Sequence, residues 1–372
     1  MNATSTPLPT VSVVIIGRNE GQRLQRCIAS VQLAQWGALH HDIWYVDSRS
    51  TDDSLAAAQA LGAQTLVLTE GPMCAAKARN LGWQAAAGEY ILFLDGDTEL
   101  HPDFVTHALQ ALQDGSLCAA WGHRRESNPQ QSLYTKVLDL DWIYPAGIPP
   151  YFGGDVLVRR SALAQVGGFD ATLNAGEEPE LCARLRAKGW KILHIDVPMT
   201  RHDLAVRSFK AYARRCYRSG IAYAEVTHRM QTLGDALWQH EARRDLVHGL
   251  LYVAAPLLLA LAFVVNGVAA LLMCLAGCAV LLRSAWRCRA RADGDVLLAL
   301  QYALHSHVQI RPWQKHFCPG CSGRWPASHA PWVPSGWPCG ALPACAKAWP
   351  RRCTVPTSSS ARWRWKARPI SA

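Results

Sequence analysis

Acidic side chains are absent from the last part of this 372-residue chain, since none follows Asp295. Ten of the 38 lysine and arginine residues lie beyond that position, which leaves 28 basic against 28 acidic residues in the rest of the chain. The net charge of +10 therefore belongs to the C-terminal part. Because the rest of the chain is neutral, we predict no nucleic-acid partner.

The N-terminus lacks the features of a secretory signal. Its first ten residues, MNATSTPLPT, contain neither a basic start nor an apolar core. A disulfide framework is also missing, because the thirteen cysteines are odd in number and those before residue 300 are scattered singly. Reduced thiols are typical of a cytosolic protein, so we expect the folded body to face the cytoplasm.

Charged residues are also absent between positions 250 and 282. As one helix this stretch is about 50 Å long, whereas the hydrocarbon core of a bilayer is about 30 Å thick. Asn266-Gly267 lies at its midpoint and is a natural turn, and arginines flank both ends. We therefore predict a transmembrane region over 246–284, formed by two short helices with both ends cytoplasmic. A single tilted span and a buried helix pair of a soluble protein are the alternatives.

Residues 296–372 form a basic segment rich in tryptophan and proline. No hydrophobic period is visible beyond about residue 310, where tryptophan recurs among Pro, Arg and Ser. An out-of-frame reading of GC-rich DNA produces this composition, so we interpret the segment as a frameshift product or an unfolded appendage. A zinc site is the alternative: one cysteine pair has the CxxC spacing, but the second pair does not. The four residues are Cys318, Cys321, Cys339 and Cys345.

Between residue 11 and about 125, apolar runs of strand length alternate with helix patterns. Strands are expected at VSVVIIG, HDIWYVD, AQTLVLTE and EYILFLD. Such alternation implies right-handed crossovers and a mostly parallel sheet. A further strand, KILHIDV, and a basic, aromatic helix follow a less regular segment. We predict a Rossmann-like α/β domain over 11–232, preceded by a disordered N-terminus of residues 1–10.

Two aspartates end one of these strands, in the run YILFLDGDTELHPD. Ligands of open α/β sheets bind outside the carboxyl ends of the strands. Asp95 and Asp97 point the same way in an extended segment, because they are two residues apart. Mg²⁺ and Mn²⁺ typically take one or two protein carboxylates and complete their shell with water and phosphate oxygens. The pair therefore indicates a divalent metal site; an Asp/Gly turn after a strand is the alternative.

Further polar residues follow the other strands at what we expect to be the same edge of the sheet. Glu20 follows the first strand and Asp47 ends the second. Arg79 and Asn80 lie near the start of the helix after the third strand. An arginine near a helix N-terminus complements a diphosphate, and a buried acid such as Asp47 can accept a hydrogen bond from a base or ribose. One cleft would hold all of them.

The chain resembles the family 2 glycosyltransferases of the GT-A fold in five segments that occur in the family's order. They cover residues 11 to about 205 and read VSVVIIGRNE, VDSRSTDDS, KARNLGWQAAAGEYILFLDGD, GGDVLVRRSALAQVGGFD and GEEPELCARLRAKGW. The resemblance implies a nucleotide-diphosphate sugar donor (UDP-sugar by default), a divalent metal ion, and transfer with inversion at the anomeric carbon. It assigns Asp47 to the nucleobase, Asp95 to the ribose or diphosphate, and Asp97 to the metal. The expected nucleotide-sugar site also includes Glu20, Arg79 and Asn80.

The same resemblance assigns the catalytic base to Glu177-Glu178, which match the family's Glu-Asp motif. The second acid is the usual base, but Glu replaces Asp here, so the choice between the two stays open. Independently, Pro179 fits the first turn of a helix that ends at Gly189. Glu178 then lies where the helix dipole favours the carboxylate, which can take a proton from an acceptor hydroxyl. A solvated capping acid is the alternative.

Two further candidates lie nearby in the sequence. His202, in TRHD after the last strand, is a candidate metal or diphosphate ligand, as in some related enzymes; an exposed histidine is the alternative. Gly154 and Asp155, in the GGD segment, are candidate acceptor contacts. A tight structural turn explains the glycines equally well.

The Gln-x-x-Arg-Trp segment of the processive family members is absent. Residues 214–220, RRCYRSG, are similar instead to the membrane-proximal helix of non-processive enzymes with lipid-linked acceptors, and their arginines suit anionic headgroups. A solvated helix face is the alternative. We predict transfer of a sugar to a hydroxyl of a lipid-linked or cell-envelope glycan acceptor at the bacterial inner membrane. A sugar nucleotidyltransferase and an inactive, membrane-tethered sugar-nucleotide binder are the alternatives.

Overall fold

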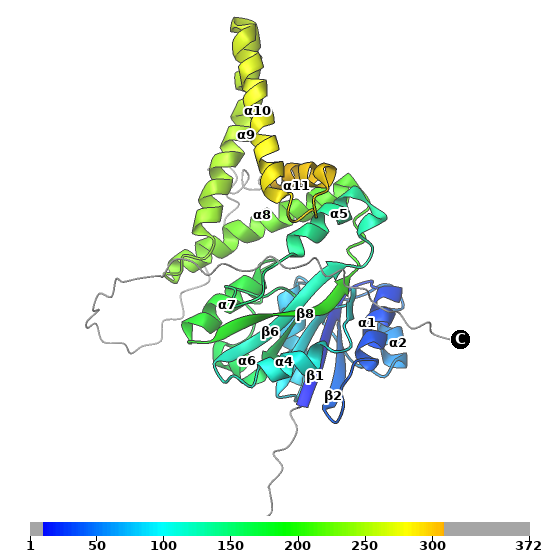
Figure 1. Cartoon of the computed structure of the whole chain (residues 1–372). Helices are drawn as coiled ribbons and strands as arrows, with labels where there is room; N and C mark the ends of the chain where they lie inside the picture. The colour runs from blue at the N-terminus through cyan, green and yellow to red at the C-terminus, as the bar shows by residue number, and fades with distance from the viewer. Residues whose placement is uncertain (1–9, 309–372) are drawn as a thin grey trace, which may run out of the picture. The chain divides into compact units, whose positions relative to one another are not determined.

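The computed structural model describes residues 10–308, and its first half alternates strands and helices as the sequence predicts (Figure 1). β1 and β4 are buried on both faces, which explains why each reads as a continuous apolar run. The elements of this half are β1 (Thr10–Gly17), α1 (Gln22–Gln32), β2 (His40–Asp47), α2 (Ser54–Ala60), β3 (Gln64–Val67), α3 (Ala75–Ala85) and β4 (Tyr90–Asp95).

The second half of the domain is less regular and completes the sheet. β8 continues past the predicted strand as far as His202. β6 was not predicted, because its buried first residues, LCAAWG, include no β-branched side chain. The elements are β5 (Thr98–Leu100), α4 (Phe104–Ala111), β6 (Leu117–Glu126), the 3₁₀ turns η1 (Pro129–Gln131) and η2 (Leu140–Trp142) with α5 (Leu133–Asp139) between them, β7 (Val156–Arg159), α6 (Arg160–Val166), α7 (Glu177–Ala187) and β8 (Lys191–His202).

The strands form one sheet in the order β3-β2-β1-β4-β7-β6-β8-β5. β3, β2, β1 and β4 are parallel to one another, as predicted. β7 is antiparallel to both β4 and β6, and β5 is antiparallel to β8, so the sheet is mixed beyond β4. The predicted α/β fold is confirmed, and its parallel part is the first half.

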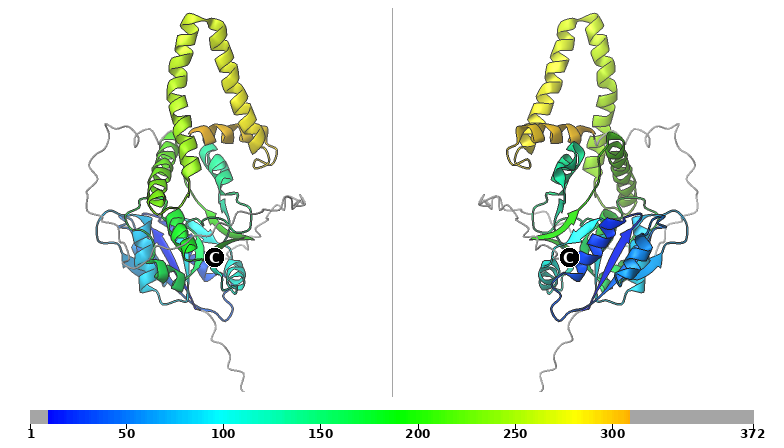
Figure 2. Two further views of the ribbon diagram at one scale, coloured as in Figure 1. Left: turned by 90° about the vertical axis from the view of Figure 1, so that its left-hand side faces the viewer. Right: turned by 90° about the vertical axis from the view of Figure 1, so that its right-hand side faces the viewer.

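Two long apolar helices follow α8 (Phe209–Thr232). α9 (Gln239–Val265) and α10 (Gly267–Cys288) converge on a turn at Asn266, whose side chain accepts a hydrogen bond from the backbone N–H of Val268 at 2.9 Å (Figure 2). Each is long and apolar enough to cross a membrane, and the apolar stretch of each helix is almost entirely unburied. The prediction of two apolar helices separated at Asn266 is confirmed.

Residues 296–308, which the composition assigned to the tail, form helix α11 (Val296–Val308). Leu298, Ala299 and Tyr302 are buried against residues of α5 and α8. The tail assignment was wrong for these residues, because their apolar side chains supply a packed helix face. The remainder of the tail, with the four cysteines of the alternative zinc site, and residues 1–9 lie outside the described residues.

A buried polar network joins α11 to η2. His305 is 2% exposed; its Nε2 lies 2.9 Å from Asp141 Oδ2 and its Nδ1 lies 2.6 Å from the hydroxyl of Tyr212 in α8. The Tyr302 hydroxyl donates to Asp141 Oδ1 at 2.8 Å and accepts from Arg291 at 2.9 Å. Because Asp141 belongs to η2, the network connects η2 to α8 and α11.

Candidate active site

The carboxyl ends of β1, β2 and β4 meet at one edge of the sheet. Asp47 pairs in register with Gly17 of β1, and Asp95 pairs with Ile16 on the other side of the same strand. The two acids therefore flank the end of β1. This is the arrangement that the alternation of strands and helices predicted.

Gly96 allows the two aspartates to stand on either side of a single residue. Its N–H donates to the carbonyl of Ile16 at 2.8 Å. A Cβ atom at this position would lie 3.1 Å from that carbonyl oxygen and 3.1 Å from Cγ of Glu20. The close approach of β1 and Glu20 thus explains the glycine between Asp95 and Asp97.

Arg79 joins the carboxylates of two different parts of the fold. It is 2% exposed, and its Nη2 lies 2.9 Å from Asp95 Oδ1. Its Nη1 lies 2.8 Å from Glu177 Oε1 and 3.2 Å from Glu178 Oε1, at the start of α7. Burial alone lowers the pKa of Arg79, but Glu178, Asp95 and Glu177 outweigh it and raise the pKa above its ordinary value.

Glu178 combines burial with a nearby like charge. Burial and the charge of Glu177 raise its pKa to about 7, although Arg79 opposes the shift. A carboxylate with a pKa near the working pH is well suited to receive a proton. Glu178 therefore has the environment of a general base, and α7 begins with both glutamates in its first turn, as predicted.

Asp95, Asp97 and His202 form a cluster whose ligand atoms lie within 4.8 Å of one another. His202 Nε2 lies 3.2 Å from Asp97 Oδ1 and 4.0 Å from Asp95 Oδ2. The antiparallel pairing of β5 with β8 places His202 opposite Thr98. The three residues that the sequence singled out for the metal site are thus brought together.

A divalent cation fits the chemistry of this cluster. Burial and the charges of Asp95 and Glu20 raise the pKa of Asp97 well above its ordinary value, so this site stabilises added positive charge. Burial and the charge of Arg124 lower the pKa of His202 well below its ordinary value, which leaves the imidazole neutral and able to act as a ligand. Two carboxylates with one neutral imidazole are suitable ligands for such an ion.

Asp47 and Glu20 lie beside the cluster, at the ends of β2 and β1. Asp47 is 2% exposed and accepts hydrogen bonds from the Tyr45 hydroxyl at 2.9 Å and from the N–H of Ser50 at 2.8 Å. Glu20 pairs with Arg23 at 2.7 Å. Both stand where a nucleotide-sugar contact was predicted, and those contacts stay predictions.

Asn80 faces a neighbouring loop. Its Nδ2 donates to the carbonyl of Phe169 at 2.8 Å, and its Oδ1 accepts from the N–H of Phe169 at 2.9 Å and from Trp83 Nε1 at 3.0 Å. The contact of Asn80 with the donor stays a prediction. These hydrogen bonds of Asn80 fix the loop before α7. In this loop, the ring centre of Phe169 lies 5.5 Å from Cζ of Arg79.

Gly154 and Asp155 lie against the charged centre. Asp155 is 2% exposed and accepts from the N–H of Asp95 at 3.1 Å and from the Thr200 hydroxyl at 2.7 Å. A Cβ atom on Gly154 would lie 2.7 Å from Asp95 Oδ2 and 2.8 Å from Arg79 Nη2. Their predicted contact with an acceptor stays a prediction, and the geometry shows Asp155 positioning Asp95.

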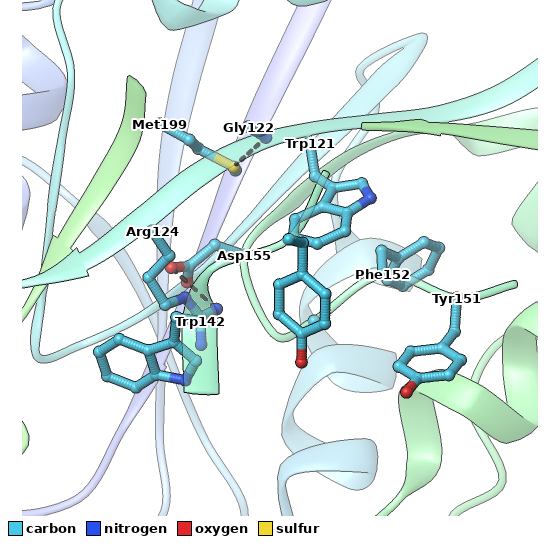
Figure 3. Close-up of a pocket in the computed structure, with 10 residues that line it drawn as sticks. Trp121, Gly122, Arg124, Trp142, Tyr151, Phe152, Asp155 and Met199 are labelled. Atoms are coloured by element: carbon cyan, nitrogen blue, oxygen red, sulfur yellow. Dashed lines mark hydrogen bonds and ion pairs between the residues drawn. The ribbon is translucent and has the colours of Figure 1, made fainter. Parts of the chain in front are cut away.

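A cavity of about 120 Å³ lies beside Asp155, and the sequence analysis missed it (Figure 3). Arg124 pairs with Asp155 at 3.0 Å and lies 5.5 Å from the ring centre of Trp142. The Trp142 ring is 5.0 Å from the ring of His202. The density of aromatic residues in this part of the sequence was the signal that could have found it. Its aromatic lining is Trp121, Trp142, Tyr144, Tyr151 and Phe152.

Comparison with known proteins identifies the family of this domain. Residues 12–169 match the family model described as Glycosyl transferase family 2. The pre-mycofactocin glycosyltransferase of Mycobacterium tuberculosis is 27% identical over 230 residues, 57% of this chain and 46% of that protein. The amylovoran biosynthesis glycosyltransferase AmsB of Erwinia amylovora is 25% identical over 228 residues, 55% of this chain and 70% of that protein. The chain thus spans about half the length of the first of these relatives and more of the second.

Among solved structures, the mannosyltransferase PcManGT from Pyrobaculum calidifontis, in complex with GDP-Man and Mn²⁺, superposes with a TM-score of 0.58. The alignment covers 82% of this chain and 88% of that one at 18% identity, so the likeness concerns the fold. Together with the family match, it shows that residues 12–169 are a family 2 glycosyltransferase domain with the GT-A fold.

Proposed function

We propose that the chain is an inverting glycosyltransferase that moves a sugar from a nucleotide-diphosphate sugar to an acceptor hydroxyl. The observation that carries the proposal is the bridge made by Arg79. One buried guanidinium contacts Asp95 at the donor edge of the sheet and Glu177 and Glu178 at the start of α7. The carboxylates for the donor and the carboxylate for the acceptor proton are therefore held at a fixed separation.

The donor binds along the edge formed by β1, β2 and β4. Asp47 accepts a hydrogen bond from the nucleobase with the lone pairs that Tyr45 and Ser50 leave unused. Asp95 contacts the ribose or the diphosphate. We take a UDP-sugar as the donor, and Glu20, Arg79 and Asn80 complete the site.

Asp97, with Asp95 and His202, would hold the Mg²⁺ or Mn²⁺ ion. When bound, this ion supplies positive charge that stabilises the departing diphosphate. The neighbouring Arg79 adds a fixed positive charge from the chain itself.

Glu178 serves as the base. The acceptor oxygen forms a bond to the anomeric carbon while the bond from that carbon to the diphosphate oxygen breaks. The hydroxyl proton passes to Glu178, and the nucleoside diphosphate leaves with the bonding electron pair. Because this is a single displacement from the opposite face, the anomeric configuration inverts. Glu177 shares Arg79 and thereby positions Glu178.

The acceptor is a lipid-linked or cell-envelope glycan at the bacterial inner membrane, with the domain in the cytoplasm. The exposed apolar side chains of α9 and α10 support a membrane location, since Val264 of α9 is 82% and Leu282 of α10 64% exposed. Arginines at both ends of the hairpin, and the basic residues of α8, suit anionic headgroups. Carbonate washing should leave the full chain in the membrane pellet; release into the supernatant would overturn the location.

The activity is tested with the full chain in detergent, Mn²⁺ or Mg²⁺, and a panel of radiolabelled nucleotide sugars. We expect release of nucleoside diphosphate that depends on the metal. Asp97→Asn should lower it by about 10²–10³-fold, whereas Asp53→Asn, an exposed aspartate at the start of α2, serves as the control. Release of pyrophosphate from a nucleoside triphosphate would show a nucleotidyltransferase instead. Donor binding without any release would show an inactive binder.

A further inference from the structure

The cavity beside Asp155 differs in chemistry from the charged centre that it adjoins. Half of its lining residues are aromatic, and Trp121 meets Tyr144 edge to face with ring centres 5.5 Å apart. Figure 3 shows Trp142 beside Arg124, with Tyr151 and Phe152 on the opposite side. Of the lining residues that the structure describes, only Arg124 and Asp155 carry charge, and they pair with each other at 3.0 Å.

The cavity is placed to receive a molecule that reacts at the charged centre. Asp155 lies in its wall and accepts from the N–H of Asp95, while a Cβ atom on its neighbour Gly154 would meet the Arg79–Asp95 pair. Its residues come from β6, η2, β8 and the segment before β7, whereas the nucleotide edge belongs to β1, β2 and β4. A ring in the cavity would therefore lie on the side of the centre away from the nucleotide.

Hydrogen bonds to a neighbouring residue and an ion pair fix part of the aromatic wall, the five rings that line the cavity. Trp142 follows Asp141, which is bound by both Tyr302 and His305 of α11. The guanidinium of Arg124 lies over the Trp142 ring and is itself paired with Asp155. A wall that is fixed before binding loses little freedom when a ligand enters, which favours a defined subsite.

We propose that this cavity binds a pyranose ring of the acceptor glycan. The inference rests on the proposed function and specifies where one sugar ring of the acceptor binds. A pyranose presents C–H groups on its faces and hydroxyls at its rim, which matches aromatic rings combined with an Arg–Asp pair. A lipid phosphate fits less well, because Arg124 is already neutralised by Asp155. An isoprenoid chain fits less well, because it would place apolar surface against the charged Arg124–Asp155 pair.

The test measures binding of simple pyranosides to the detergent-solubilised full chain by saturation-transfer NMR. The probes are methyl glucoside, methyl mannoside and methyl N-acetylglucosaminide. We expect saturation transfer to at least one of them. Tyr144→Ala should weaken its binding about fivefold or more, whereas Phe209→Ala, which removes an exposed ring of α8 outside the cavity, should leave it unchanged. Thermal unfolding of both variants checks that they are folded.

Competition assigns the source of the ring. Added UDP should leave the pyranoside signal in place, and farnesyl phosphate should not displace it. No saturation transfer to any probe, or equal binding by wild type and Tyr144→Ala, would overturn the inference. Displacement by a UDP-sugar but not by UDP would give the cavity to the donor sugar, and displacement by farnesyl phosphate would give it to a lipid; each also overturns it. UDP binding is measured separately by calorimetry, so loss of the proposed function is recognised independently.

Discussion

The two sides of the candidate site are built from different parts of the sheet and in different chemistry. The acidic side takes Asp47, Asp95 and Asp97 from the ends of parallel strands and from the turn after β4. The aromatic side takes its residues from mixed strands, a 3₁₀ turn and the loop before β7. Arg79 and Asp155 lie between them. The regular half thus places Asp47, Asp95 and Asp97, whereas the irregular half places the aromatic rings together with Glu178 in α7 and His202 in β8.

Replacing Glu178, the proposed base, should have the largest effect of all, because the carboxylate that is proposed to accept the hydroxyl proton is then lost. Glu178→Gln should lower transfer by about 10²–10⁴-fold. In the wild type, the rate at low substrate concentration should rise with pH through about 7 and then level, because burial and Glu177 raise the pKa of Glu178 to about 7 and only the ionised form accepts a proton. The variant should lose this rise, and Glu99→Gln, a control at a half-exposed glutamate of β5, should keep it. A rise that persists in Glu178→Gln but disappears in Glu177→Gln would make Glu177 the base.

The link between the two sides should matter next most. Arg79→Met removes the buried guanidinium that pairs with the carboxylates of Asp95, Glu177 and Glu178. The free energy of unfolding should fall by about 3–5 kcal/mol, measured by denaturant unfolding of the solubilised protein. Arg26→Met removes a half-exposed arginine that pairs with Glu99 and Asp203, and should cost less than about 1 kcal/mol. Equal losses in the two variants would contradict the central role of Arg79.

The boundary between the two sides can be tested with two adjacent glycines. Gly154→Ala places a methyl group within 2.8 Å of both Asp95 and Arg79, so one of them must move. We expect about a tenfold loss in donor hydrolysis, from an overpacking cost of about 1–3 kcal/mol. In Gly153→Ala the nearest contact is 3.7 Å, to Arg124, and hydrolysis should stay near that of wild type. The comparison fails if both variants behave alike.

The smallest effect should come from the support behind the aromatic wall. Tyr302→Phe removes the hydroxyl that donates to Asp141 but keeps the packed ring. The lost hydrogen bond contributes about 1 kcal/mol to the stability of the network. Its loss should raise KM for the acceptor a few-fold and leave donor hydrolysis unchanged. Tyr252→Phe removes a hydroxyl that bonds to His307, away from the cavity, and is the matched control. A change in donor hydrolysis in Tyr302→Phe would show that α11 supports the acidic side as well.

The acidic side could be predicted because its signals are local. The buried strands β1 and β4 read as apolar runs, and Asp95 must emerge where β4 ends. Glu178 was singled out by the resemblance of Glu177-Glu178 to the family's Glu-Asp motif, and Pro179 independently indicated the first turn of α7. His202 required one more step, the pairing of β8 with β5, which nothing in the local sequence reveals.

The aromatic side could not be predicted, because irregular strand pairing determines which way its side chains point. The register between β6 and β8 shifts on both sides of His123, so the strand period does not say which way Trp121 and Arg124 point. Asn80 shows the same limit in another form. Its position in the chain was read correctly, but its amide turns to the backbone of Phe169, a contact 89 residues away in the sequence. Helix α11 was missed because its apolar pattern is short and was grouped with the tryptophan- and proline-rich sequence that follows it.

Asp141 and Tyr302, which share a hydrogen bond, lie in the sequence on either side of α9 and α10. If the chain traversed a bilayer once between them, the two residues would end in separate aqueous phases and could never meet. The bond therefore imposes a parity rule: any insertion of this segment must pass through the lipid an even number of times. A tag that is inserted after the hairpin and one that is inserted before it should always be labelled from the same face of the membrane.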